Sequence, residues 1–127
     1  MSAPLLIIDA ANVVGSVPDG WWRDRFGATE RLRDKLASLP VSGVPGVEPP
    51  VDVVMVVEGK ARDVPSSDTI RVIPAPASGD GDDAIVELVR TEGADRSCYV
   101  VTADRGLKAR VTELGASVLG PSTVRPS

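Results

Sequence analysis

The feature that most constrains this chain is a series of short, almost continuously apolar segments. Four of them cover residues 4–9, 51–57, 69–75 and 97–103, and residues 116–120 form a shorter fifth. A strand that is apolar on both faces must be covered on both faces, which is typical of a parallel sheet lying between two layers of helices. The pattern therefore predicts a parallel sheet of about five strands.

Segments with helical periodicity lie between these strands. Leucines recur at i, i+4 and i+7 within residues 28–39, which predicts a helix that ends before Pro40. A second helix is expected to begin near Asp82 or Asp83, and a third to end at Gly115. The order strand, helix, strand, strand, helix, strand, helix, strand predicts an α/β fold, a three-layer α/β/α sandwich with a mostly parallel central sheet.

The length of 127 residues is expected to give a single domain, with a core over about residues 4–120. Residues 40–50 are rich in Pro and Gly, which predicts an exposed connection, and residues 121–127 are expected to form a frayed tail. The apolar runs are far shorter than the roughly 20 residues of a membrane span, and the N-terminus lacks a signal-peptide pattern. A cytoplasmic location without membrane contact is therefore expected.

Composition excludes the commonest forms of catalysis. The chain has no histidine and one cysteine, which rules out Ser-His-Asp triads, Cys-His pairs and histidine-dependent nucleases and argues against an ordinary zinc site. Cys98 lies in an apolar segment and is expected to be a small buried hydrophobe. Catalysis must then use carboxylates, hydroxyls, lysine or arginine. The net charge of −4 argues against nucleic-acid binding by the whole-molecule field but is compatible with a local basic face.

Acidic residues follow the predicted strands at the points where the strands end. They are Asp9, Glu58, Asp80, Asp82, Asp83 and Asp104. Because ligands bind at the carboxyl ends of the strands in an open parallel sheet, these acids are expected to share one rim. Taken singly, each of them has an ordinary explanation as a helix cap, a turn residue or a solvated side chain.

A set of acids on one rim has an electrostatic consequence that a single acid does not have. Two carboxylates about 5 Å apart repel by roughly 3 kcal/mol at an effective dielectric constant near 20, and a divalent cation removes that conflict. All-oxygen ligands favour Mg²⁺ or Mn²⁺, and such ions assist phosphodiester hydrolysis. Asn12 fits such a site because an amide can orient a carboxylate or a water without adding charge, although it could instead be a turn or helix cap.

Three motifs resemble one known family. They are D-A-A-N-V-V from Asp9, G-D-D-A-I-V-E-L-V from Gly81 and V-V-T-A-D-R-G-L from Val100. In this order and spacing they are similar to the NYN domains of the PIN-like nuclease superfamily, particularly the YacP-like bacterial branch, over about residues 4–120. The family usually has Gly after the first acid, where this chain has Ala10.

The resemblance implies a PIN-like fold and a ribonuclease that depends on Mg²⁺ or Mn²⁺, with RNA, single-stranded or structured, as its partner. The implied catalytic residues are Asp9, Asn12, Asp83 and Asp104. The implied metal ligands are Asp9, Asp82, Asp83 and Asp104. Glu58 has no secure counterpart in the family, and whether it and Asp80 join the site is left open. Also left open are a ribosome or other RNA assembly that presents the target, and a monomer or weak dimer as the oligomeric state.

Basic and aromatic side chains near the same rim are candidates for substrate contacts. The cations Arg105, Lys108, Lys60 and Arg62 flank the acids along the chain and could position the RNA backbone. Trp22 belongs to a tryptophan pair close after the first acid, and its ring could stack on a base. Solvated cations and a purely structural tryptophan pair are the simpler alternatives.

Three other functions are alternatives to a nuclease for a parallel α/β chain with acids at its strand ends. A phosphoacceptor receiver domain requires paired acids after the first strand and a lysine after the fifth, and a haloacid-dehalogenase phosphatase requires Asp-x-Asp, whereas position 11 is Ala. Neither pattern is present. The stronger alternative is a non-catalytic PIN-like module that binds RNA or a protein partner.

Overall fold

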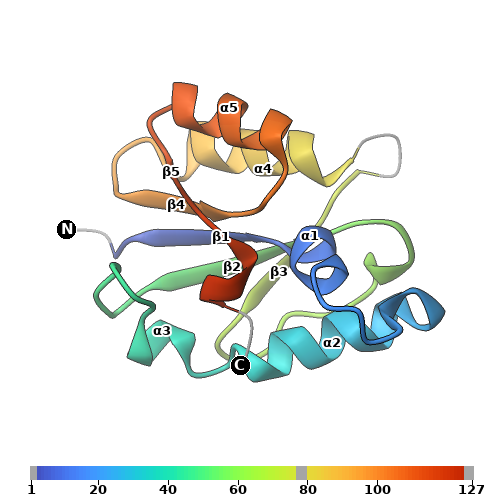
Figure 1. Cartoon of the computed structure of the whole chain (residues 1–127). Helices are drawn as coiled ribbons and strands as arrows, with labels where there is room; N and C mark the ends of the chain where they lie inside the picture. Colours follow the sequence, from blue (N-terminus) through green and yellow to red (C-terminus); the bar gives the residue numbers. More distant parts are fainter. Residues whose placement is uncertain (1–2, 77–79, 125–127) are drawn as a thin grey trace.

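The computed structural model describes residues 3–76 and 80–124, and its five strands form one parallel sheet (Figure 1). The strands are β1 (Leu5–Asp9), β2 (Asp52–Val57), β3 (Arg71–Pro74), β4 (Cys98–Val101) and β5 (Ser117–Leu119). Their order across the sheet is β3-β2-β1-β4-β5, and each neighbouring pair is parallel. Each predicted strand is therefore confirmed, with bounds one or two residues shorter at most ends.

The sheet is buried on both faces, as its apolar strands require. Along β1, Leu6 and Ile8 belong to one hydrophobic cluster and Leu5 and Ile7 to the other, because successive side chains point to opposite faces. Helices α1 (Ala10–Gly15), α2 (Arg25–Lys35) and α3 (Leu39–Ser42) cover the first face, and α4 (Gly81–Thr91) and α5 (Arg105–Glu113) cover the second (Figure 1). The three-layer α/β/α sandwich is thus confirmed.

The helix predicted over residues 28–39 begins earlier and ends earlier than expected. Asp24 caps α2 by accepting a hydrogen bond from the N–H of Gly27 at 2.9 Å, which fixes the start of the helix at Arg25. Residues after Lys35 form a turn, and Pro40 occupies the first turn of the separate helix α3. Proline fits there because the first helical N–H groups have no intrahelical partner.

Two segments that were expected to be irregular contain short regular elements and contribute buried residues to the core. Within residues 40–50, α3 is followed by an isolated bridge between Val44 and Val47, and both valines are buried. In the expected tail, a 3₁₀ turn η3 (Pro121–Thr123) brings Val124 into the core. Residues 125–127 lie outside the described part of the chain.

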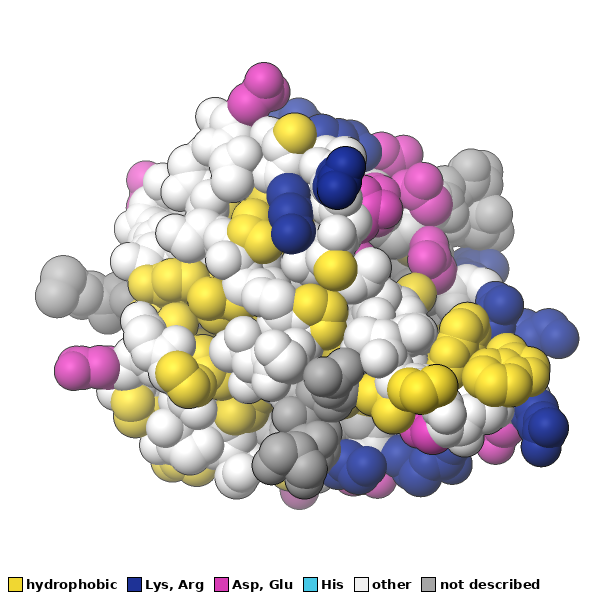
Figure 2. Space-filling view, viewed as in Figure 1, with side chains coloured by type: hydrophobic (Ala, Val, Ile, Leu, Met, Phe, Trp, Pro, Cys, Tyr) yellow, Lys and Arg dark blue, Asp and Glu magenta, His cyan; other side chains and the backbone are white. Residues whose placement is uncertain are grey.

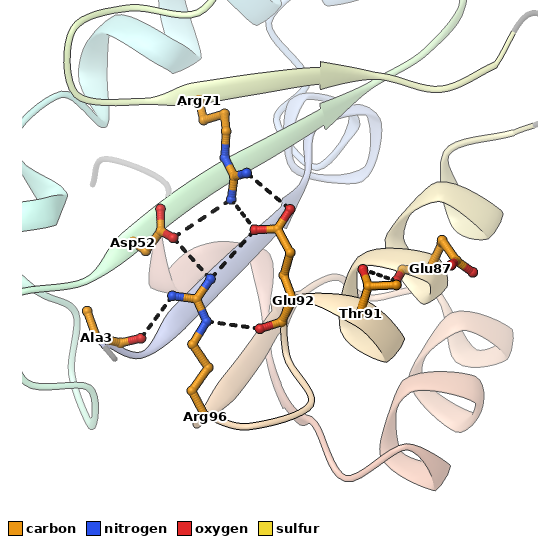
Figure 3. Close-up of polar contacts among 7 residues, drawn as sticks. All are labelled: Ala3, Asp52, Arg71, Glu87, Thr91, Glu92 and Arg96. Atoms are coloured by element: carbon orange, nitrogen blue, oxygen red, sulfur yellow. Dashed lines mark hydrogen bonds and ion pairs between the residues drawn. The ribbon is translucent and has the colours of Figure 1, made fainter. Parts of the chain in front are cut away.

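An ion-pair network joins the end of α4 to the starts of β1 and β2 (Figure 3). Arg71 binds Glu92 at 2.6 Å, and Arg96 binds Asp52 at 3.1 Å. Arg96 also donates to the backbone oxygens of Ala3 and Glu92, so one side chain connects three segments. The hydrogen bond from Arg71 holds the pKa of Glu92 below its ordinary value. This network lies at the amino edge of the sheet, away from the acids that end the strands.

No helix within residues 3–76 or 80–124 is long and apolar enough to cross a membrane.

Candidate functional site

Carboxylates from four separate segments converge at the carboxyl edge of the sheet, on the right in Figure 1. Asp9 ends β1, Glu58 follows β2, Asp82 lies in the first turn of α4, and Asp104 precedes α5. Glu58 and Asp104 both act electrostatically on Asp9, and all three act on Asp82. The parallel topology therefore gathers acids that are up to 95 positions apart in the chain, from 9 to 104.

Asp9 is the most enclosed of these acids, with 6% of its surface exposed. Burial is the main cause that raises its pKa, and Glu58 and Asp104 add to the rise. The hydroxyl of Thr102, which donates a hydrogen bond to Asp9 at 2.9 Å, opposes this rise in pKa, and the nearby backbone N–H of Asn12 opposes it to a smaller extent. The carboxylate is thus held in one orientation in a negatively charged environment.

Thr102 is the residue of this site that sequence reasoning missed. Its side chain is fully buried, and its Oγ1 donates to Asp9 and accepts a hydrogen bond from the N–H of Asp104 at 3.1 Å. One hydroxyl therefore links the end of β1 to the start of α5. The available signal was a polar residue closing the apolar run of β4, two positions before an acid.

Asn12 connects the same two segments from the side of α1. Its Oδ1 accepts a hydrogen bond from the N–H of Ala103 at 2.8 Å. Because the side-chain oxygen is engaged in this contact, the amide NH₂ is the part that could act on a carboxylate, a water or a phosphate. A catalytic role for Asn12 remains a prediction.

The two adjacent acids at the start of α4 have different surroundings. Asp82 is half-buried, and burial together with Asp104, Asp9, Asp80 and Glu58 raises its pKa to about 6. Asp83 is exposed, and its Oδ1 accepts from Arg110 on α5 at 3.0 Å. The geometry therefore favours Asp82 over Asp83 as the α4 acid of the site.

Asp80 and Glu58 organise the beginning of α4. Asp80 caps the helix by accepting from the N–H of Asp83 at 3.1 Å, which is the ordinary capping role anticipated for it. Glu58 accepts a hydrogen bond from the N–H of Gly81, so the end of β2 is tied directly to the helix start. A Cβ on Gly81 would lie 3.2 Å from the Glu58 carboxylate, which leaves little room for any other residue.

The basic candidates lie on two sides of these acids. Arg105 is exposed in the first turn of α5, and Lys108 is half-buried one turn later. Lys60 lies in the 3₁₀ turn η2 (Gly59–Ala61) and Arg62 directly follows it, and both side chains are exposed. In Figure 2, acidic side chains gather on the right of the molecule near the start of α4, with basic and hydrophobic side chains below them.

The tryptophan pair lies in the 3₁₀ turn η1 (Trp21–Arg23), between α1 and α2. Trp22 is 55% exposed and meets Trp21 edge to face, with ring centroids 5.9 Å apart. Trp21 is half-buried, and the guanidinium of Arg25 lies 5.3 Å from its ring centroid. The exposed ring of Trp22 is thus free of core packing, and its part in substrate binding remains a prediction.

The chemistry of the acidic side chains suits a divalent ion, but the distances between them are not those of a formed metal site. Their all-oxygen donors and mutual repulsion are the conditions under which Mg²⁺ or Mn²⁺ binds. Within the described residues, however, no group of three or more Asp, Glu or Cys side chains is arranged to hold an ion. An ion here would complete its shell with water and phosphate oxygens, as Mg²⁺ commonly does.

Comparison with known proteins finds a likeness in fold alone. No protein-family model and no curated protein matches the chain. Two crystal structures of Rae1 (YacP) from Bacillus subtilis do match its fold. A tryptophan-to-leucine mutant has a TM-score of 0.74 and 18% identity and covers 95% of this chain and 72% of its own. The other has a TM-score of 0.77 and 17% identity, covering 98% and 71%. The chain therefore has a YacP-like fold.

Proposed function

We propose that this protein is a metal-dependent ribonuclease that hydrolyses phosphodiester bonds within single-stranded RNA. The observation that carries the proposal is the convergence of Asp9, Asp82, Asp104 and Glu58 on one edge of the sheet. Two likenesses support it: the motifs resemble the YacP-like branch of the PIN-like nucleases, and the fold is similar to that of Rae1 (YacP). RNA is accordingly the proposed partner.

Asp9, Asp82 and Asp104 are the residues that would hold Mg²⁺ or Mn²⁺, with Glu58 beside them. When bound, such an ion polarises phosphoryl oxygens and lowers the pKa of water, which supplies chemistry that a chain without histidine lacks. Asp83 is less suited to this role, because its exposed carboxylate is paired with Arg110 of the neighbouring helix α5.

The remaining residues would position the substrate. Thr102 and Asn12 fix the relative placement of the Asp9 and Asp104 segments, which preorganises these two of the acids. Arg105 follows Asp104 directly at the start of α5 and Lys108 lies about one turn later, and both would contact phosphates flanking the scissile bond. Without such cations, the acidic edge would repel an RNA strand.

The test is cleavage by the Asp9→Asn variant. The native protein is incubated with a mixed RNA pool with Mn²⁺ or with EDTA, and the cut ends are sequenced. Cleavage is expected only with the metal ion and is expected to fall at least 100-fold in Asp9→Asn, because the amide removes the charge of the most enclosed acid. Asp95→Asn is the matched control, since Asp95 is exposed in the turn after α4 at the other end of the molecule. Metal-independent cleavage, or full activity in Asp9→Asn with an unchanged fold, would reject the proposal.

A non-catalytic RNA-binding module is the second candidate. The observation that favours it is the lack of a preformed group of three carboxylates within the described residues. Titration with Mn²⁺, followed by thermal stability and by calorimetry, separates the two. Saturable binding that is lost in Asp9→Asn supports the nuclease, and no binding of the ion supports the module.

A further inference from the structure

A cleft of about 510 Å³ opens beside the acids, between α1, the start of α2 and η2. Its volume falls in the range of roughly 300–1,000 Å³ that is typical of small-molecule sites. The floor is apolar and includes Ala11, Val14 and Ala61. Glu58 and Asp80 line the end nearest the carboxylate site, so the cleft continues directly from it.

The wall of the cleft combines an aromatic ring with two cations. Trp21, Arg25 and Arg62 all line it, and the guanidinium of Arg25 lies over the Trp21 ring. An aromatic ring and a guanidinium plane are the two surfaces on which proteins stack unpaired bases. The chain thus places base-stacking groups next to an apolar floor and close to the proposed cleavage site.

We infer that this cleft binds one unpaired nucleotide of the RNA strand next to the scissile phosphate, with its base against Trp21 and Arg25. The inference rests on the proposed function and adds to it which part of the RNA the protein binds. A base can enter such a cleft only when it is not paired, so the substrate class is a strand with an extruded or single-stranded nucleotide.

Charge decides how the nucleotide lies. Its phosphates are negative and are repelled by Glu58 and Asp80 at one end of the cleft, whereas Arg25 and Arg62 attract them. The neutral base therefore takes the apolar floor, and the phosphate on the side away from the cleavage site lies toward the two arginines. Trp22 does not line the cleft and is not needed for this contact.

A second hollow between α1 and α2 has a volume of about 110 Å³, which is too small for a nucleotide. Arg31 and Lys35 line it. It therefore provides control positions that share helix α2 with Arg25 but lie outside the proposed site.

The chain has two tryptophans, so Trp22→Phe leaves Trp21 as the only one and makes its fluorescence a probe of the cleft. In EDTA, this variant is titrated with a five-nucleotide RNA and with an abasic strand of the same length and charge. We expect saturable quenching by the RNA, and binding at least 10-fold weaker with little quenching by the abasic strand. Equal binding and quenching by both strands would overturn the inference.

Two substitutions in the same background locate the binding site. Ala11→Leu fills the cleft from an exposed position of α1, and Arg25→Ala removes the guanidinium; each is expected to weaken RNA binding at least 5-fold. Ala37→Leu, at an exposed position in the turn after α2, and Arg31→Ala are the matched controls and are expected to change RNA binding less than 2-fold. Losses as large in the controls would overturn the inference. Because EDTA prevents metal-dependent cleavage, these results are independent of the Asp9→Asn test.

Discussion

At the scale of single residues, the hydroxyl of Thr102 connects Asp9 to Asp104, the two acids of the site that are farthest apart in the sequence. It is fully buried and bonded to both Asp9 and the backbone of Asp104. Thr102→Val keeps the shape of the side chain but removes the hydroxyl that donates to the buried Asp9 carboxylate. We expect the free energy of unfolding to fall by about 1–3 kcal/mol, measured by chemical denaturation.

The same substitution is expected to change the pH dependence of cleavage. The hydrogen bond from Thr102 favours the charged form of Asp9, so its loss raises the pKa of Asp9 further above the ordinary value. The acid limb of the pH–rate profile should therefore move to higher pH. Thr102→Ser retains the hydroxyl and should keep both the stability and the profile close to those of the native protein. An unchanged profile in Thr102→Val would show that the hydroxyl only fills space.

Asp82 gives a stability prediction with a defined pH window. Its pKa rises from 3.8 to about 6 in the folded chain, so folding favours the protonated form. Stability is therefore lost as pH rises from about 4 to about 6, and the full penalty is present above that range. Asp82→Asn removes the penalty and should stabilise the metal-free protein at pH 7.5 by about 1 kcal/mol, a value reduced for partial exposure.

The check is denaturation of both proteins at pH 7.5 and pH 3.5 in EDTA. The difference should shrink to a few tenths of a kcal/mol at pH 3.5, because Asp82 is then mostly protonated in both the folded and the unfolded chain. Asp83→Asn serves as the control. Its carboxylate is exposed and bonded to Arg110, so its removal should not stabilise the protein. Equal stabilisation by both variants would contradict the placement of Asp82 in the acidic cluster.

The sequence predicted the acidic rim, but the resemblance implied Asp83 as the catalytic acid of α4, whereas the geometry favours Asp82. The rim follows from parallel topology, since strand ends that align bring their last residues together. The choice depends on where α4 begins, because successive helical residues point about 100° apart. That start is set by the Asp80 cap and by the Glu58 contact with Gly81, which is a tertiary interaction that spacing alone does not reveal.

At the scale of elements, long apolar or periodic segments were predictable and short helices were not. The segment after β1, AANVVG, has six residues, two of them β-branched valines, and therefore little intrinsic tendency to form a helix. It becomes α1 because Val13 packs into the core, with 1% of its surface exposed. The cleft was not predictable for the same reason, since it depends on how α1 and α2 pack against each other.

The network in Figure 3 predicts how strongly the far end of α4 is fixed. The side chain of Arg96 is 14% exposed and bonds to Asp52 and to two backbone oxygens. Arg96→Met keeps the apolar stem and removes these bonds. We expect the free energy of unfolding to fall by about 2 kcal/mol, less than for a fully buried pair because Asp52 and Glu92 are partly exposed and retain Arg71.

Arg90→Met provides the comparison on the same helix. Arg90 pairs with Glu87 at i,i+3, and both side chains are about 60% exposed. Such a pair contributes a few tenths of a kcal/mol, so its loss should change the unfolding free energy by less than about 0.5 kcal/mol. Urea denaturation of the two variants side by side measures the difference. A loss in Arg96→Met no larger than in Arg90→Met would show that the network does not fix the helix end.

At the scale of the whole molecule, the arrangement of charge matters more than its total. The net charge is −4, yet Arg25, Arg62, Arg105 and Lys108 all lie around the acidic edge. The overall electrostatic field of a protein with this negative net charge repels RNA. Binding through a local set of cations remains possible in a negatively charged protein, because charges farther away than about 10 Å are largely screened at ordinary salt.

This arrangement predicts the salt dependence of RNA binding. If the four cations each neutralise one phosphate of a single strand, log Kd should rise with log salt with a slope of about 3, since each contact contributes about 0.7. Fluorescence anisotropy of a labelled RNA in EDTA between 50 and about 300 mM salt measures this slope. Arg105→Ala should lower the slope by about 0.7, because its side chain lies beside Asp104. Arg90→Ala, on the outer face of α4, should leave the slope unchanged. A slope near zero, or an equal effect of both substitutions, would mean that the strand does not cross the acidic edge.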